Sequence, residues 1–181
     1  MSQRTRTNLL RAVVLVLVVG LTVVLYLNRA RVQNLGVYGY PGLFLISLLS
    51  NATIILPVPG VAFTAVFGSI FNPWFVALVA GTGAALGELS GYLAGFSGQA
   101  VIENRPQYER VTGWMREYGD WVILALAFIP NPLFDVAGMA SGALRVPLYR
   151  FLIFCWIGKV GKMALFAFFG SALPGWFSAL G

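Results

Sequence analysis

The sequence predicts an all-α integral membrane protein built as an inverted repeat, in which each copy is a re-entrant helical hairpin followed by a transmembrane helix. Hydrophobic residues make up 59% of the 181 residues and charged residues only 10%, against roughly 45 to 50% and about 25% in soluble domains. Prolines interrupt the long uncharged stretches, and these interruptions recur in both halves of the chain. A chain this short lacks the polar surface to enclose so many apolar stretches in water.

An additional N-terminal transmembrane helix is predicted within residues 1–38. The stretch from Leu9 to Leu27 is apolar except for Arg11 and is long enough to cross a bilayer. The sequence Tyr26-Leu27-Asn28-Arg29 does not offer the small-residue site at which a signal peptide is cleaved. We therefore expect a helix that is retained.

The first repeat, residues 39–98, is predicted to form a hairpin and then a span. Its apolar stretch from Gly39 to Phe71 is broken at Pro57-Val58-Pro59-Gly60, because prolines interrupt helical hydrogen bonding. The arm after the break, about 11 residues long, covers roughly 16 Å of a hydrocarbon core about 30 Å thick. The two arms therefore fit a re-entrant hairpin, and Asn72-Pro73 begins a full span that ends near Phe96.

A polar linker, residues 99–118, separates the repeats and is predicted to form an interfacial helix. Pro106 is placed to begin this helix and Gly119 to end it. Its apolar residues recur at helical spacing: Val111, Trp114, Met115 and Tyr118. We interpret it as a connector that rests on lipid headgroups, with a partner-binding site as the alternative.

The second repeat, residues 119–172, follows the same plan and leaves a short tail, residues 173–181. An arm from Trp121 to Ile129 meets a break at Pro130-Asn131-Pro132, a second arm runs to Leu144, and a span follows Pro147. The offset between the halves is 73 residues at the first break and 74 residues at the spans. It pairs Pro57 with Pro130, Pro59 with Pro132, Gly68 with Gly142, Pro73 with Pro147, Gly87 with Gly161 and Glu88 with Lys162.

The distribution of arginines predicts the orientation. With the N-terminus in the cytoplasm, the cytoplasmic side collects Arg4, Arg6, Arg11, Arg105, Arg110, Arg116, Arg145 and Arg150, whereas the outer side has Arg29 and Arg31. This asymmetry agrees with the positive-inside rule. We expect a multi-pass protein of the plasma (inner) membrane. The two hairpins then enter from opposite faces, as in many inverted-repeat transporters.

The two breaks are predicted to line one shared cavity. Backbone groups freed at a proline inside a membrane need partners, so such breaks persist only against protein or a wet cavity. Tips that enter from opposite faces should meet near mid-depth, where helix ends could attract an anion; packing kinks are the alternative. The tip residues are Pro57, Pro59, Gly60, Pro130, Asn131 and Pro132.

Four charged side chains lie at positions that the predicted spans and arms place in or near hydrocarbon: Glu88, Asp135, Lys159 and Lys162. Such charges are costly unless they face protein or water. Lys159 and Lys162 share a helix face, and Glu88 holds the repeat position of Lys162, so a carboxylate could face an ammonium as a gate or proton site. The alternatives are a buried ion pair that fixes helix register and, for Asp135, a helix cap.

The composition argues against an enzyme. The sequence has no histidine and one cysteine, Cys155, so it lacks the commonest general acid and base, and we expect neither a metal nor another cofactor. The few basic residues flank apolar stretches, which the membrane explains without a nucleic acid. Glycines at 83, 87, 91 and 95 recur every four residues, a pattern typical of close helix packing that would also allow a homodimer.

Three motifs resemble the DedA family of the VTT-domain superfamily, also called SNARE-associated Golgi proteins. They are Leu56-Pro57-Val58-Pro59-Gly60, the helix Gly83 to Gly95 with Gly87-Glu88 and Gly91-Tyr92, and Ile129-Pro130 through Gly138 to Gly142. The resemblance covers roughly residues 40–172 and implies paired re-entrant hairpins and transport of an anionic lipid phosphate, such as undecaprenyl phosphate, or of a phospholipid. Family members commonly have an acidic residue at the position of Val61 and arginines around the second break, and this chain has neither feature.

Three functional hypotheses follow. The first is a lipid flippase or scramblase, in which Arg145 and Arg150 could bind the headgroup phosphate or act as ordinary cytoplasmic anchors. The second is an ion-coupled small-solute transporter with Glu88 as the coupling site, in which protons are the candidate ion. The third is a non-transporting membrane scaffold.

Overall fold

The computed structural model describes residues 38–52, 60–98, 105–131 and 133–179, together with isolated positions between residues 16 and 31. The regular elements between residues 39 and 179 are α-helices: α3 (Gly39–Ala52), α4 (Gly60–Gly68), α5 (Pro73–Gly87), α6 (Leu89–Phe96), α7 (Arg105–Tyr118), α8 (Trp121–Phe128), α9 (Leu133–Ala143) and α10 (Leu148–Ala179). The predicted N-terminal helix lies largely outside the described residues, as do Pro57, Pro59 and Pro132.

Within the part of the chain that the structure describes, two segments are long and apolar enough to cross a membrane. One is Pro73–Phe96, which comprises α5 and α6, and the other is the Leu148–Ala172 part of α10. Glu88 lies at the turn between α5 and α6, but its N–H still bonds to Ala84 O at 3.2 Å and its carbonyl accepts from Tyr92 N at 3.1 Å. The helical hydrogen bonds therefore continue through Glu88, as the prediction of a single span requires.

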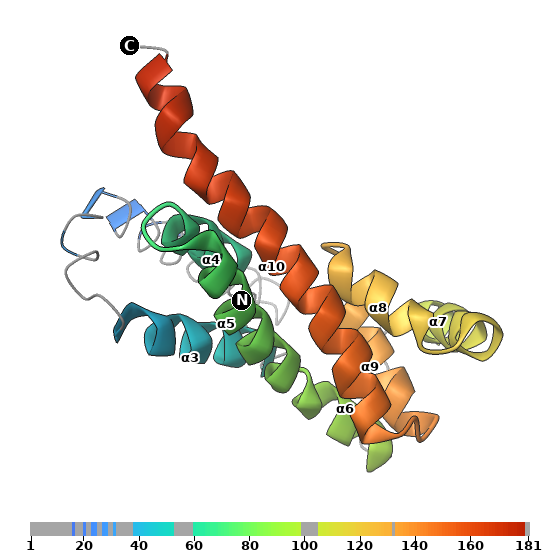
Figure 1. Cartoon of the computed structure of the whole chain (residues 1–181). Coiled ribbons are helices and arrows are strands. Elements are labelled where there is room, and N and C mark those ends of the chain that lie inside the picture. The colour runs from blue at the N-terminus through green and yellow to red at the C-terminus, as the bar shows by residue number, and fades with distance from the viewer. Residues whose placement is uncertain are drawn as a thin grey trace, which may run out of the picture.

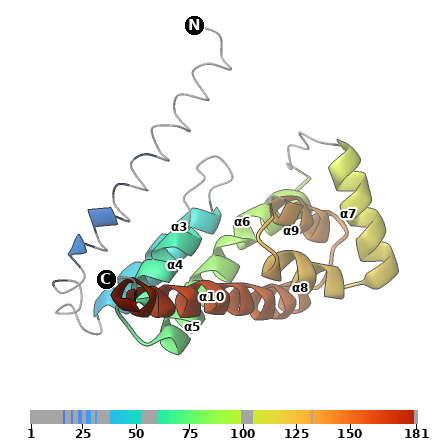
Figure 2. The ribbon, with the colours of Figure 1, turned by 90° about the horizontal axis from the view of Figure 1, so that it is seen from above.

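The two spans lie side by side and antiparallel. As the residue number increases along α5, the number of the contacting residue in α10 decreases: Trp74 contacts Phe168, Gly81 contacts Val160, and Thr82 contacts Trp156. Figures 1 and 2 show α10 extending along the described part of the chain, with α3 and α4 toward its C-terminal half and α7, α8 and α9 toward its N-terminal half.

Local chemistry accounts for the helix boundaries. Asn72 caps α5 by accepting a hydrogen bond from Trp74 N at 3.0 Å, and Pro73 occupies the first turn. Gly119 ends α7 with a φ of 62°, in the left-handed region that favours glycine. These starts and stops agree with the sequence predictions, whereas α10 continues past Ala172 through Pro174 to Ala179, into the predicted tail.

The buried apolar side chains form two clusters, one toward each end of the spans. The first joins α3, α4 and α5 to the C-terminal half of α10 and includes Leu43, Phe67 and Met163. The second joins α7, α8 and α9 to the N-terminal half of α10 and includes Val111, Ile123 and Phe151. The apolar face of the predicted interfacial helix α7 is thus partly buried against protein, because Val111 and Met115 belong to this core.

Candidate functional site

A buried ion pair joins the two spans between the two apolar clusters. Lys159 Nζ of α10 donates to Glu88 Oε1 at the α5–α6 turn. The residues are only 2% and 3% exposed. Lys159 lies about 16 Å along α10 from Leu148 at 1.5 Å per residue, roughly halfway through a hydrocarbon core about 30 Å thick. The pair is therefore enclosed by protein near mid-depth of the spans.

Lys159 also contacts helices that flank both chain breaks. Its Nζ donates to Asn51 Oδ1 at 2.8 Å and lies 4.4 Å from the ring centroid of Phe134. Asn51 is in the last turn of α3, six residues before Pro57 of the first break, and Phe134 is in the first turn of α9, directly after the second break. One ammonium group thus connects the end of α3, through Asn51, with the start of α9, through Phe134.

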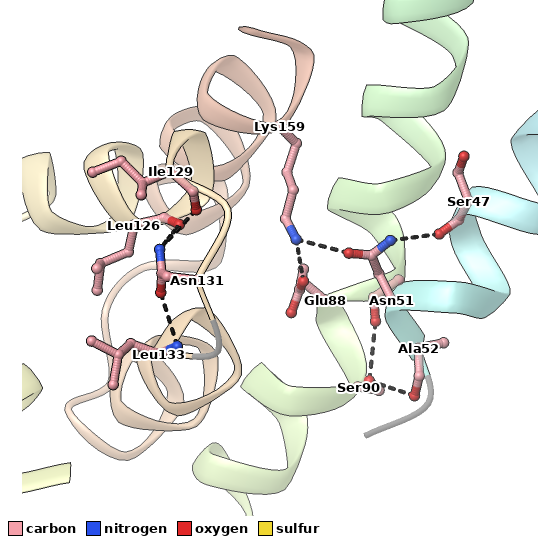
Figure 3. A network of polar contacts seen from close by, with 11 residues as sticks. Ser47, Asn51, Ala52, Glu88, Ser90, Leu126, Ile129, Asn131, Leu133 and Lys159 are labelled. Atoms are coloured by element: carbon pink, nitrogen blue, oxygen red, sulfur yellow. Dashed lines mark hydrogen bonds and ion pairs between the residues drawn. The ribbon is translucent and has the colours of Figure 1, made fainter. Parts of the chain in front are cut away.

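The amide of Asn51 extends this network to Ser47, as Figure 3 shows. Asn51 Nδ2 donates to the carbonyl of Ser47 at 2.8 Å, which fixes the amide orientation toward Lys159. The hydroxyl of Ser47 is itself fully buried and has no hydrogen-bond partner among the described residues. A buried hydroxyl that is left unsatisfied in this way is unusual.

The other two charges predicted for the membrane interior belong to the same region. Lys162, one turn beyond Lys159, is buried and forms no ion pair among the described residues. Asp135, in the first turn of α9, is exposed and lies within electrostatic range of both lysines. The four charges sum to zero, and the two ammonium groups could together bind an anion that displaces a carboxylate.

The carboxylate of Glu88 pairs with Lys159, whereas its repeat equivalent Lys162 is not its partner. The antiparallel register explains the difference. Gly81 of α5 is level with Val160, so Glu88, farther along its span, is level with an earlier part of α10. Lysine side chains on a helix lean toward its N-terminus, so Lys159 reaches the carboxylate.

Sequence reasoning missed two residues of this site, Asn51 and Phe134. Ser47 and Asn51 are polar residues four apart in a mostly apolar arm that also contains Ser50 and Thr53, and that spacing could have indicated a polar face on α3. Nothing in the sequence distinguishes Phe134 from the 13 other phenylalanines. Its position over the Lys159 ammonium follows only from the packing of α9 against the spans.

The described tip residues play structural parts. Asn131 bridges the second break, because its Nδ2 donates to Leu126 O at 3.0 Å and to Ile129 O at 2.7 Å, while its Oδ1 accepts from Leu133 N at 2.8 Å (Figure 3). Asn131, and not Asp135, therefore supplies the side-chain oxygen at the start of α9. Gly60 is buried at the start of α4, and Pro130 is exposed.

Arg145 and Arg150, the predicted headgroup-binding residues, differ in their surroundings. Arg150 Nε and Nη2 both donate to Asp120 Oδ2 at 2.6 Å, and the arginine side chain is 51% exposed. This pair ties the start of α8 to the start of α10. Arg145 is exposed, with a φ of 55° in the connection between α9 and α10.

Two open apolar grooves mark the surface of the described residues. The first, of about 230 Å³, lies between α5 and α10 and is lined by Thr82, Ala85, Leu86, Leu152, Ile153 and Trp156. The second, of about 390 Å³, lies between α7 and α8 and is lined by Trp114, Tyr118, Trp121, Val122, Ala125 and Leu126. Neither groove is lined by a described residue of the predicted hairpin tips.

Comparison with known proteins gives a family match and partial relatives. Residues 58–172 match the profile of the VTT domain. Vacuole membrane protein KMS2 of Arabidopsis thaliana is 31% identical over 102 residues, which are 46% of this chain and 24% of that protein. Vacuole membrane protein KMS1 of the same organism is 32% identical over 105 residues, which are 46% of this chain and 25% of that protein. Vacuole membrane protein 1 homolog of Dictyostelium discoideum is 45% identical over 51 residues, which are 28% of this chain and 13% of that protein. The chain therefore spans about a quarter or less of these relatives. No solved structure matches it significantly.

Proposed function

This chain belongs to the VTT domain family, and from that premise we propose that it carries an anionic lipid from one membrane leaflet to the other. The lipid is a polyprenyl phosphate such as undecaprenyl phosphate, or a phospholipid. It is moved without covalent change, so the protein acts as a flippase or scramblase and not as an enzyme. The observation that carries the proposal is the buried ammonium of Lys159, which contacts the end of α3 in one half of the chain and the start of α9 in the other.

Helix packing supports a repeat of two copies. The first helix of each copy lies on its own span, since α3 packs on α5 and α8 packs on α10. The second helix lies on the span of the other copy, since α4 packs on α10 and α9 packs on α6. Gly68 of α4 meets the backbone of Ala167, and its repeat equivalent Gly142 meets the backbone of Tyr92. Because the two spans are antiparallel, copies related in this way are inverted.

The lengths of the short helices support re-entrant hairpins. The longest of the four, α3, has 14 residues, and covers about 21 Å of a hydrocarbon core about 30 Å thick. Helices α4, α8 and α9 are shorter, with 9, 8 and 11 residues. None of these helices is long enough to cross alone, which supports the proposal that each pair enters and returns on one side. The proposed orientation, with the N-terminus of the chain cytoplasmic, rests on the distribution of arginines.

The buried charges then provide the path for the headgroup. In the resting state Glu88 neutralises Lys159, and the ammonium holds the ends of α3 and α9 together. An entering phosphate replaces Glu88 as the acceptor for Lys159 and also accepts from Lys162, because both ammonium groups can donate to phosphate oxygens. A proton taken up by Glu88 favours the same exchange by removing the competing negative charge.

Leaflet exchange in liposomes tests the proposal. The purified protein is reconstituted with a fluorescent phospholipid or a labelled polyprenyl phosphate, and the outer leaflet is bleached chemically at intervals. We expect faster exchange than in empty vesicles, and slower exchange in Lys162→Met. Arg116→Gln, which removes an exposed arginine of α7, serves as the matched control and should exchange lipid like the wild type.

The alternative functions correspond to other outcomes of this experiment. A pH jump that drives solute flux without lipid exchange, and a loss of that flux in Glu88→Gln, would support an ion-coupled solute transporter. Normal folding with neither lipid exchange nor flux would reject both transport hypotheses and leave a scaffold.

A further inference from the structure

The groove between α7 and α8 carries an aromatic lining that the translocation path does not use. Trp114 and Tyr118 come from the end of α7 and Trp121 from the start of α8, while Ala125 and Leu126 close its far end. Trp121 and Tyr118 are 66% and 57% exposed. Tryptophan and tyrosine are enriched at the headgroup level of membranes, where rings with one polar edge are stable.

The groove runs along α8 toward the hydrocarbon of the membrane, which favours a lipid chain as its occupant. It follows α8 from Trp121, beside the polar turn at Gly119 and Asp120, to Leu126, a distance of about 7 Å at 1.5 Å per residue. Helix α8 is wholly apolar after Asp120, so this end of the groove points into hydrocarbon. A soluble protein would have to follow α8 into the bilayer to fill it, whereas an acyl chain is already there.

The guanidinium of Arg150, which has donors not used by Asp120, lies near the Trp121 end of the groove. Arg150 binds Asp120, the residue before Trp121, and the Trp121 ring packs edge-on against Phe154 at 5.5 Å, one turn after Arg150 in α10. Arginine has five N–H donors, and two of its nitrogens, Nε and Nη2, share one Asp120 oxygen. The remaining donors are on a side chain that is half exposed.

The opposite rim is negative, which fixes the side on which an anion can sit. The Tyr118 hydroxyl donates to the Glu117 carboxylate, which raises the pKa of Tyr118 above its usual value and keeps the phenol neutral. A phosphate at that rim would be repelled by Glu117. On the α10 side the carboxylate of Asp120 is paired with Arg150 and its charge is offset, so an anionic headgroup is favoured there and not beside Glu117.

We propose that this groove docks one anionic phospholipid of the surrounding bilayer, with a chain along α8 and its phosphate on Arg150. The site lies at headgroup level, away from the buried pair of Glu88 and Lys159, and its occupancy does not depend on translocation. Docking holds α7, the link between the halves, against the start of α10.

Tryptophan quenching tests the site. The full chain is reconstituted in phosphatidylcholine with a minor fraction of phosphatidylglycerol brominated on its chains, and compared with an equal fraction of brominated phosphatidylcholine. The contribution of Trp114 and Trp121 is obtained by subtracting the signal of Trp114→Phe/Trp121→Phe. We expect brominated phosphatidylglycerol to reach a given level of quenching at about one fifth of the fraction that brominated phosphatidylcholine needs. This factor corresponds to a binding free energy of about 1 kcal/mol per arginine near headgroups.

Three variants locate the effect. Arg150→Gln should abolish the preference for phosphatidylglycerol, and Arg116→Gln, on the other face of α7, should keep it. Ala125→Leu fills the groove at an exposed position without touching the Asp120 pair, and should lower quenching by both lipids even if Arg150→Gln fails to fold. Any of three results would overturn the proposal: equal quenching by the two lipids in the wild type, the same loss of the phosphatidylglycerol preference in Arg116→Gln as in Arg150→Gln, or unchanged quenching in Ala125→Leu.

Discussion

The ion pair between Glu88 and Lys159 allows a prediction in which the size of the effect separates structure from function. The changes are Glu88→Gln and Lys159→Met, each close in shape to the residue that it replaces, and the combination of both. Both residues are at most 3% exposed, so each single change leaves a charge with neither water nor its counter-ion. The double change removes both charges together.

The expected magnitudes follow from this enclosure. Removing one partner of a buried pair destabilises a protein by about 3–5 kcal/mol, whereas replacing both is often close to neutral. Lys159→Met also leaves Asn51 Oδ1 without its donor, which adds about 1 kcal/mol. We therefore expect each single variant to lose about 4 kcal/mol of unfolding free energy, the double variant no more than about 2 kcal/mol, and a coupling energy of about 6 kcal/mol by difference.

Reversible unfolding in mixed micelles, followed by circular dichroism, measures these free energies. Arg116→Gln is the control and should change stability by no more than about 0.5 kcal/mol, as exposed substitutions do. Single variants that each lose less than about 1 kcal/mol and add without coupling would refute the reasoning, because the charges would then be solvated. Lipid exchange by the folded double variant decides the role: full activity would make the pair a device for helix register, and loss of activity would make it part of the path.

Three further predictions concern contacts that hold the helices together. Gly142→Ala should destabilise the fold by about 2 kcal/mol or more, because the added methyl group meets the Tyr92 carbonyl. Gly113→Ala in α7 has open space around it and should stabilise the fold by about 0.5–1 kcal/mol. Thermal unfolding of both variants measures these changes. Tyr92→Phe should cost about 1 kcal/mol through loss of the 2.7 Å hydrogen bond to Val146 O, measured by the same unfolding. Asn131→Ala should cost about 1–3 kcal/mol and speed hydrogen exchange at the start of α9, because three backbone groups lose their partner; unchanged exchange would contradict the bridging role of Asn131.

Much of the helix pattern could be predicted because prolines and glycines act locally. Asn72-Pro73 starts α5, Pro147 precedes α10, and Gly119 ends α7, each by a rule that needs no information from the rest of the fold. Pro174 shows the limit of such rules, because α10 continues through it. A local signal gives the position of a break, but tertiary packing decides whether the helix actually ends there.

The partners of the buried charges could be predicted only in part. Hydrophobicity alone indicates that Glu88, Lys159 and Lys162 must be enclosed, since each lies in an apolar stretch. Which lysine meets Glu88 depends on the register of the antiparallel spans, and a shift of one turn exchanges Lys159 for Lys162. The sequence repeat relates positions across an axis, and residues related in this way need not touch.

The spacing of glycines explains why the ion pair is the place where a polar group could pass. Gly83 and Gly87 meet the backbone of α3, Gly95 meets α9, and Gly158 meets α8, so the short helices and the spans touch backbone to backbone. Because these glycine faces are covered within the chain, a homodimer would need another surface. Contacts of this kind leave no room for a headgroup and cannot loosen gradually. At Lys159 the helices are instead joined through long side chains, whose hydrogen bonds can be exchanged one at a time. The end of α3 is itself packed backbone to backbone against Gly87, whereas a methyl group added at Gly91 or Gly138, where α6 faces α9, would find its nearest neighbour 3.8 Å or more away. Separation of the start of α9 from Lys159 therefore disrupts less packing than separation of α3, and we expect an opening for a lipid headgroup to begin on the α9 side.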